Sequence, residues 1–194
     1  MAAEHVMSAA AVGDAPLPLG RPSRAWSVSP AVIVLAGVVA VATSLRLGLT
    51  PYGIMAAGSL GVLVVLSVID LQTRLLPNKI LLPATAAVFA AQAVFYPERL
   101  LEAVIAAAVA AAITFAPALF NPAAMGMGDV KLAGFLGVLL GFAAIPAMML
   151  GFLATAPVLA VMLVLRGREA RRTAIPLGPF LALGAAIVVL TGAA

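Results

Sequence analysis

Residues 61–70 read GVLVVLSVID, an apolar run that ends in a carboxylate. Counted back to residue 52, the run has the roughly 20-residue length of a helix that crosses a bilayer. The rest of the chain has the same character, since 64% of its 194 residues are hydrophobic and 9% are charged. A water-soluble domain carries about 25% charged residues. Most of this protein's surface must therefore face lipid, and we expect an integral membrane protein.

Similar apolar runs continue along the chain, separated by polar or proline-containing segments. They predict an all-α fold, a polytopic membrane bundle of about seven helices. The region 130–165 is too long for one span, and only Pro146 marks a turn within it. It forms either two tilted helices or a re-entrant hairpin, which would leave six crossings, and in both cases its two ends lie on the same side. The predicted spans are 29–45, 52–70, 80–96, 100–120, 130–145, 147–165 and 175–192.

The segment before the first span differs from the rest of the chain. Residues 1–27 contain Glu4, Asp14 and several prolines, and they lack the basic region of a secretory signal. We interpret them as a flexible cytoplasmic tail. Residues 28–194 are then a single membrane-embedded domain.

The positive charges predict the orientation, because Lys and Arg concentrate on the cytoplasmic side of membrane proteins. An N-terminus in the cytoplasm puts nine of the 11 Lys and Arg residues on that side and leaves Arg46 and Arg99 opposite. The basic cluster at 166–172 suits contact with anionic lipid headgroups. The modest positive excess gives no support for nucleic-acid binding. With no cysteine and one histidine, His5, no metal site is expected.

Two acidic residues lie at the ends of spans on the predicted cytoplasmic side. Asp70 ends the second span and Asp129 begins the fifth. Because these spans run in opposite directions, both carboxylates reach the same depth, and an ionisable residue that borders a span is expected to be functional. Two neighbouring carboxylates that share a proton form the catalytic pair of aspartic proteases. The alternative is that each acid pairs with a base, Asp70 with Arg74 and Asp129 with Lys131.

Glycines precede the second aspartate. Gly126 and Gly128 lie in GMGDVKL, residues 126–132. Glycine permits a positive φ and the close approach of another backbone. We therefore expect this turn to present the carboxylate of Asp129 to an extended peptide. Gly-rich turns are common, so the pattern alone does not specify a protease.

Three segments together resemble the type IV prepilin peptidase family, which are membrane aspartic proteases of the GxGD type. They follow one another in the order found in that family, and they span about residues 60–190. The resemblance implies that Asp70 and Asp129 are the catalytic pair. The segments are DLQTRLLPN (70–78), GMGDVKL with the following GFLGVLLG (126–132 and 134–141), and IPLGPFLALG (175–184).

The resemblance also suggests roles for the residues around this pair. Gly126 and Gly128 would shape the catalytic turn. Lys131 would either orient a carboxylate or hold its loop at the lipid headgroups. Pro77 and Asn78 would start the next helix.

The third segment enters the last span near the depth of the pair. Pro176, Gly178 and Pro179 would help to position a substrate there, although a helix-start role suits the two prolines equally well. The segment has IPLGPF where the family has IPFGPF.

The chain departs from the larger members of the family. It has no cysteine and no room for their cytoplasmic insert with paired CxxC motifs, so it resembles a short form. Larger members also methylate the new N-terminus with S-adenosylmethionine. No residue pattern here indicates a methyl-donor site, and N-methyltransferase activity stays open.

The resemblance implies a membrane aspartic endopeptidase, integral to a bacterial-type cytoplasmic membrane. It would remove leader peptides from type IV prepilins, or from prepilin-like secretion proteins, at the cytoplasmic face, and proteolysis would need no metal or other cofactor. Two other classes stay open. One is a small transporter that relays protons or cations through Asp70 and Asp129, and the other is a non-catalytic scaffold of a pilus or secretion system. The sequence does not indicate an oligomeric state.

Overall fold

The computed structural model describes residues 28–120, 125–166 and 176–192. Within these ranges the chain is helical and has no strand, which confirms the predicted all-α class. Two short 3-10 turns, η1 (Pro97–Arg99) and η2 (Gly141–Ala143), join longer helices. The α-helices are α2 (Pro30–Leu47), α3 (Pro51–Thr73), α4 (Asn78–Phe95), α5 (Leu100–Phe120), α6 (Met127–Leu140), α7 (Ala144–Arg166) and α8 (Gly178–Thr191).

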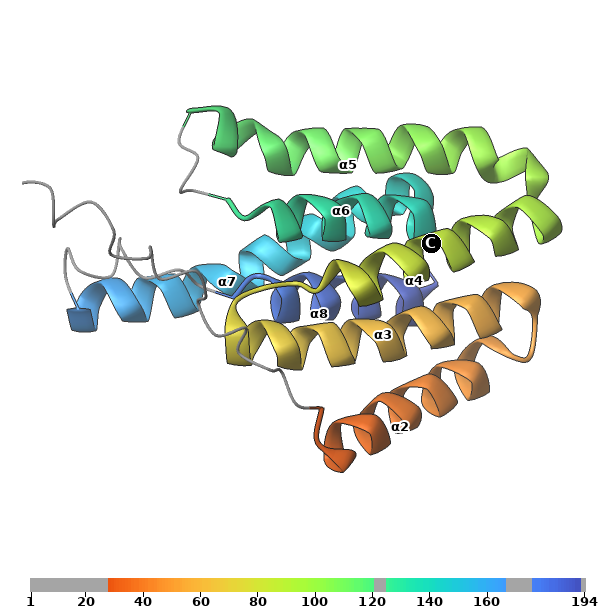
Figure 1. The fold of residues 1–194 in the computed structure, drawn as a ribbon, viewed down its shortest axis with the longest axis horizontal. Helices are drawn as coiled ribbons and strands as arrows, with labels where there is room; N and C mark the ends of the chain where they lie inside the picture. The colour runs from red at the N-terminus through yellow and green to blue at the C-terminus, as the bar shows by residue number, and fades with distance from the viewer. Residues whose placement is uncertain (1–27, 121–124, 167–175, 193–194) are drawn as a thin grey trace, which may run out of the picture.

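Consecutive helices run in opposite directions through the bundle (Figure 1). Helices α2, α4, α6 and α8 therefore begin at the end of the bundle where α3, α5 and α7 finish. We call this the aspartate end, because it holds Asp70 in the last turn of α3 and Asp129 in the first turn of α6. The η1 and η2 turns lie at the opposite end, which we call the far end.

The turn within the region 130–165 lies at η2 and not at Pro146, so its predicted place was wrong. Gly141 there has a φ of 59°, a left-handed conformation that glycine adopts without strain. Pro146 lies in the first turn of α7, where the N–H groups have no partner in the helix, so a proline is tolerated. Helices α6 and α7 form a hairpin, and both of its ends reach the aspartate end, as expected (Figure 1).

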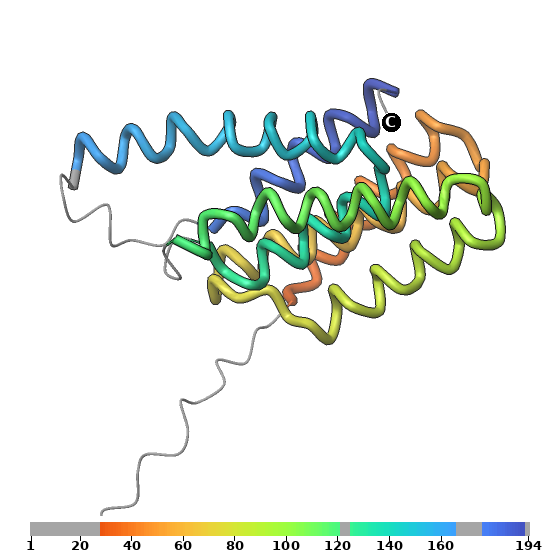
Figure 2. The backbone as a smooth tube through the Cα atoms, turned by 90° about the horizontal axis from the view of Figure 1, so that it is seen from above, coloured from red at the N-terminus to blue at the C-terminus, as the bar shows by residue number. Residues whose placement is uncertain are grey.

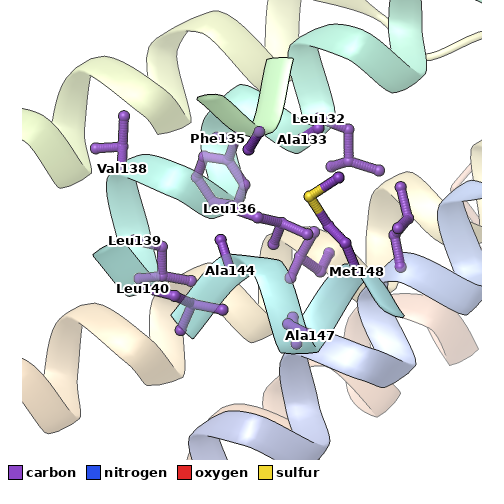
Figure 3. Packing of buried hydrophobic residues seen from close by; sticks show 14 of the residues in the cluster. Leu132, Ala133, Phe135, Leu136, Val138, Leu139, Leu140, Ala144, Ala147 and Met148 are labelled. Carbon is purple, nitrogen blue, oxygen red and sulfur yellow. The ribbon is translucent and has the colours of Figure 1, made fainter. Parts of the chain in front are cut away.

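Helix α6 is the centre of the packing. Apart from Lys131 and Gly134, every residue from 130 to 140 is buried. Figure 3 shows the side chains of Phe135 and Leu136 among residues of α7 that include Ala147 and Met148. Helix α5 also packs against α6, and α8 packs against both α3 and α7. A helix that is apolar all round is stable only when other helices or lipid cover it.

Glycines allow the tightest helix crossings. A Cβ atom on Gly137 of α6 would collide with the backbone of Ala107 in α5. In the same way, a Cβ atom on Gly184 of α8 would collide with the backbone of Ala147 in α7. Small residues at such crossings let membrane helices gain van der Waals contact. These two glycines therefore set the spacing of α5 from α6 and of α7 from α8.

The helices have the length and composition of an integral membrane protein. Helices α6 and α8 are the short members, with 14 residues each. At 1.5 Å per residue each is about 21 Å long, less than the roughly 30 Å apolar core of a bilayer. Helix α7, by contrast, runs past its neighbours at the aspartate end (Figure 2). In the part of the chain that the structure describes, five segments are long and apolar enough to cross a membrane: Pro30–Leu47, Pro51–Thr73, Asn78–Phe95, Pro97–Phe120, and Met127–Leu165, which contains both α6 and most of α7.

Some predictions fall outside the described residues. They are the flexible tail at 1–27, most of the basic cluster at 166–172, and Ile175 at the start of the third segment.

Candidate active site

Asp70 and Asp129 lie at the same end of the bundle, as their positions in the sequence predict (Figure 1). Asp70 is buried, with 4% of its surface exposed, and Asp129 is partly buried. The charge of Asp70 acts on Asp129, so the two carboxylates are within Coulombic range of each other. Two helices that are not consecutive thus contribute to one acidic site.

The N-terminus of α8 holds Asp70. The backbone N–H of Gly178, the first residue of that helix, donates a hydrogen bond to Asp70 Oδ2 at 2.9 Å. This N–H has no partner within its own helix, and a helix N-terminus favours a negative group. A Cβ atom at position 178 would lie 2.9 Å from the same oxygen. The third segment, predicted to position a substrate, therefore contacts the carboxylate of Asp70 itself.

Two prolines lie on either side of this contact. Pro176 comes just before α8, and Pro179 is its second residue. A proline at a helix start removes an N–H that would have no partner in any case. These positions agree with the helix-start role, while a substrate-positioning role for Pro176 and Pro179 stays a prediction.

Asp129 is held by the start of its own helix. Gly126 is the N-cap of α6 and Asp129 is the third residue of that helix. The Asp129 carboxylate lies against Gly126, since a Cβ atom there would be 3.2 Å from Asp129 Oδ2. The first turn of a helix favours a negative side chain, because its N–H groups point toward it. Each aspartate therefore lies at the start of a helix, Asp70 at that of α8 and Asp129 at that of α6.

The glycines of the GxGD turn act through close packing and not through a positive φ, so that part of the expectation was wrong. Gly126 has a φ of −75°, and Gly128 is helical. A Cβ atom on Gly128 would lie 3.1 Å from Leu76 Cβ, in the loop between α3 and α4. Because Gly128 has no side chain, the loop between α3 and α4 can lie against the first turn of α6. No chemical feature of the sequence singles out Leu76, because its contribution is a contact surface.

Lys131 connects the first two motifs. Its Nζ donates a hydrogen bond to Asn78 Oδ1 at 3.0 Å. Asn78 is the first residue of α4 and Pro77 is its N-cap, so both lie at the start of the next helix, as expected. The contact that the structure gives Lys131 is therefore with a neutral amide, and not the pairing with Asp129 that the sequence left open.

A family model described as the type IV leader peptidase family matches residues 57–165. This match covers more than half of the chain and includes both aspartates. The chain belongs to the type IV leader peptidase family. Two similar proteins carry the name prepilin leader peptidase/N-methyltransferase. One, from Aeromonas salmonicida (strain A449), is 32% identical over 172 residues. The other, from Burkholderia pseudomallei (strain 1026b), is 28% identical over 168 residues.

Both alignments cover 84% of this chain, but only 58% and 54% of the two relatives. The chain thus spans little more than half the length of the curated relatives it matches. No solved structure matches the chain. The family membership confirms the resemblance found in the three segments.

Among the residues that the structure describes, no group of three or more His, Cys, Asp or Glu side chains is placed to hold a metal ion. A polar cavity lined by Tyr52, Gln92 and Glu102, among others, lies at the far end of the bundle. It does not fit a methyl donor for a peptide end released at the aspartates, because the two sites are at opposite ends.

Proposed function

We propose that this chain is a membrane aspartic endopeptidase that removes leader peptides from prepilin-like substrates. The observation that carries the proposal is the acidic site. A buried Asp70, bound to the N-terminus of α8, lies within Coulombic range of Asp129 at one end of a membrane bundle. Membership of the leader peptidase family supports the same conclusion.

The two carboxylates would divide the chemistry of peptide hydrolysis between them. Carboxylates that interact in a low-dielectric site share one proton. The ionised member takes a proton from water, and the resulting hydroxide adds to the scissile carbonyl carbon. The protonated member donates a hydrogen bond to the carbonyl oxygen. A proton then passes to the leaving nitrogen as the C–N bond breaks. The N–H group of Gly178 would keep the carboxylate of Asp70 oriented.

The position of the site supports cleavage at the cytoplasmic surface. The aspartate end carries Arg74, Lys79 and Lys131, which the positive-inside rule places in the cytoplasm. The apolar helix of a prepilin-like substrate would lie in the bilayer beside the bundle. Its polar leader would extend into the cytoplasm, so the scissile bond would meet the aspartates at the boundary.

The buried serine and threonine hydroxyl groups do not favour the alternative of a proton or cation relay. Thr43, Ser59, Thr114 and Thr155 each donate to the carbonyl oxygen four residues earlier in their own helix. Polar groups of a transport path would be expected to face a shared cavity or one another. We therefore propose proteolysis, and not a relay of protons or cations, for this chain.

The test is processing of a type IV prepilin that is co-expressed with the full chain. We expect Asp70→Asn and Asp129→Asn each to slow leader removal by at least roughly 10³-fold, because one carboxylate can no longer transfer a proton. Immunoblots of precursor and mature prepilin measure the rate. The matched control is Asp14→Asn, the same chemical change in the N-terminal segment, which should process normally. Complete processing by both dyad variants, at normal membrane levels, would overturn the proposal.

A further inference from the structure

The far end of the bundle contains a second polar site, remote from the aspartates. It is a cavity of about 330 Å³ between α3, α4, α5 and the η2 turn. This volume lies within the range of small-ligand sites, roughly 300–1,000 Å³. The proposed peptidase chemistry makes no use of it. Its polar lining residues are Tyr52, Gln92, Tyr96, Glu98, Arg99 and Glu102.

Two buried polar atoms in this cavity have no partner among the described residues. The side chain of Gln92 is 6% exposed. Its Nε2 donates to the backbone oxygen of Val138, which fixes the amide, and its Oε1 is left without a donor. The hydroxyl of Tyr52 is likewise buried and unpaired. A buried polar group without a hydrogen-bond partner is energetically unfavourable, so such atoms point to a bound group that is hydrogen-bonded to them.

The charges around the cavity indicate what that group is. Glu98 and Glu102 supply two carboxylates, and Gln92 Oε1 is an acceptor that needs a donor. Arg99 is the cation of the lining, and it lies within Coulombic range of the Tyr52 hydroxyl. Acceptors with carboxylates suit an ammonium group that carries N–H bonds, whereas an arginine and a phenol suit a phosphate. The cavity thus has complementary partners for both charges of a zwitterion.

An apolar groove adjoins this polar cavity. It has a volume of about 520 Å³ and is lined by Pro51, Ile54, Gly58 and Val62 of α3 and by facing residues of α4. Met55 lines both the groove and the cavity. From Pro51 to Val62 the groove follows α3 for about 16 Å toward the middle of the membrane. A polar site at a helix end joined to an apolar groove of this length matches a headgroup joined to an acyl chain.

We propose that the far end binds a phospholipid whose zwitterionic headgroup carries a primary ammonium, as in phosphatidylethanolamine. The ammonium donates to Gln92 Oε1 and to Glu102, and the phosphate accepts from Arg99 and from the Tyr52 hydroxyl. One acyl chain lies in the groove between α3 and α4. A choline headgroup has no N–H bond to offer Gln92, so the site discriminates against phosphatidylcholine.

The test is the lipid retained by the full chain when it is purified in detergent with equal amounts of phosphatidylethanolamine, phosphatidylcholine and phosphatidylglycerol. Native mass spectrometry measures how much of each stays bound. We expect phosphatidylethanolamine to exceed each of the other two by roughly tenfold, the value of one hydrogen bond to a charged group. Equal retention of the three lipids would overturn the proposal.

Variants separate the headgroup site from general lipid adhesion. Arg99→Gln and Tyr52→Phe each remove a partner of the phosphate, so each should lower retention of phosphatidylethanolamine. The matched control is Arg46→Gln, which removes another exposed cation at the same end but outside the cavity, and it should retain the lipid normally. If Arg46→Gln loses as much lipid as Arg99→Gln, the attraction is a surface charge effect and the assigned site is wrong.

A third variant tests the groove and the source of the ligand. Gly58 lines the groove, and a Cβ atom there would meet nothing within 4 Å. Gly58→Leu should therefore fill the groove without disturbing the helices, and it should lower retention of the lipid. Free phosphoethanolamine, added alone, should leave the melting temperature unchanged. A clear rise would mean that the site takes a soluble zwitterion, and this would overturn the assignment to a lipid.

Discussion

At the scale of single residues, the site depends on the absence of a side chain at position 178. The backbone N–H of Gly178 reaches the carboxylate of Asp70 because no side chain stands between them. The hydrogen bond fixes one oxygen of the carboxylate and leaves the other for chemistry. In a pair of acids, small displacements matter, since proton transfer requires a separation near that of a hydrogen bond.

Replacing Gly178 with alanine should lower the activity and leave the protein folded in the membrane. The added Cβ atom would lie 2.9 Å from Asp70 Oδ2, so the carboxylate must move. A displacement of about 1 Å in a catalytic group costs roughly 10²-fold in rate. We expect Gly178→Ala to lower the rate of prepilin processing by about this factor while the protein stays in the membrane. The control is Gly37→Ala, in open space on α2. Equal rates for the two variants would show that the Gly178 contact does not position the acid.

At the scale of helices, length and composition made the elements predictable. Each of the seven predicted spans corresponds to a helix, because an apolar run can be satisfied in lipid only as a helix. The turn at Gly141 was not predicted, because Pro146 is the residue of this region that usually marks a helix end. A proline in the first turn of a helix, however, interrupts no hydrogen bond of that helix. The left-handed glycine became evident only in the folded chain.

The contacts within the site were less accessible to sequence reasoning. Asp70 and Asp129 could be paired because alternation of the spans puts them at one depth. The bond from Gly178 to Asp70 and the bond from Lys131 to Asn78 join residues 108 and 53 positions apart. Neither follows from a local pattern, since both depend on how α8 and α6 pack against the rest of the bundle.

The helix crossings give a prediction for stability. A Cβ atom on Gly137 would meet the backbone of Ala107, which cannot rotate away as a side chain does. We expect Gly137→Ala to lower the free energy of unfolding in detergent by about 1–3 kcal/mol, the usual cost of overpacking. Gly37→Ala meets no atom and replaces a poor helix former, so it should be neutral or stabilising by up to about 1 kcal/mol. Thermal unfolding of both variants measures the difference, and equal melting temperatures would contradict the tight crossing.

At the scale of the whole molecule, the orientation of the bundle decides which compartment supplies the substrate. The chain has no cysteine, so a single introduced thiol reports on one position without background. Lys79, near the aspartates, and Glu98, at the far end, are both exposed. We expect a membrane-impermeant maleimide to label Glu98→Cys in intact cells and to label Lys79→Cys only after the cells are opened. The opposite pattern would place the aspartates outside the cytoplasm.

The 14-residue helix α8 has a consequence for the surrounding membrane, because Leu183, Ile187 and Leu190 along it are exposed. With about 21 Å of helix against roughly 30 Å of hydrocarbon, α8 creates a hydrophobic mismatch of about 9 Å. Lipid beside it must thin, and the water boundary then dips toward the helix start that holds Asp70. Hydrolysis needs that water, so thin bilayers should favour it. We expect processing in vesicles of short-chain phosphatidylcholine to be faster than in long-chain vesicles, measured at equal fluidity. A rate that does not vary with chain length would mean that water reaches the aspartates without deforming the bilayer.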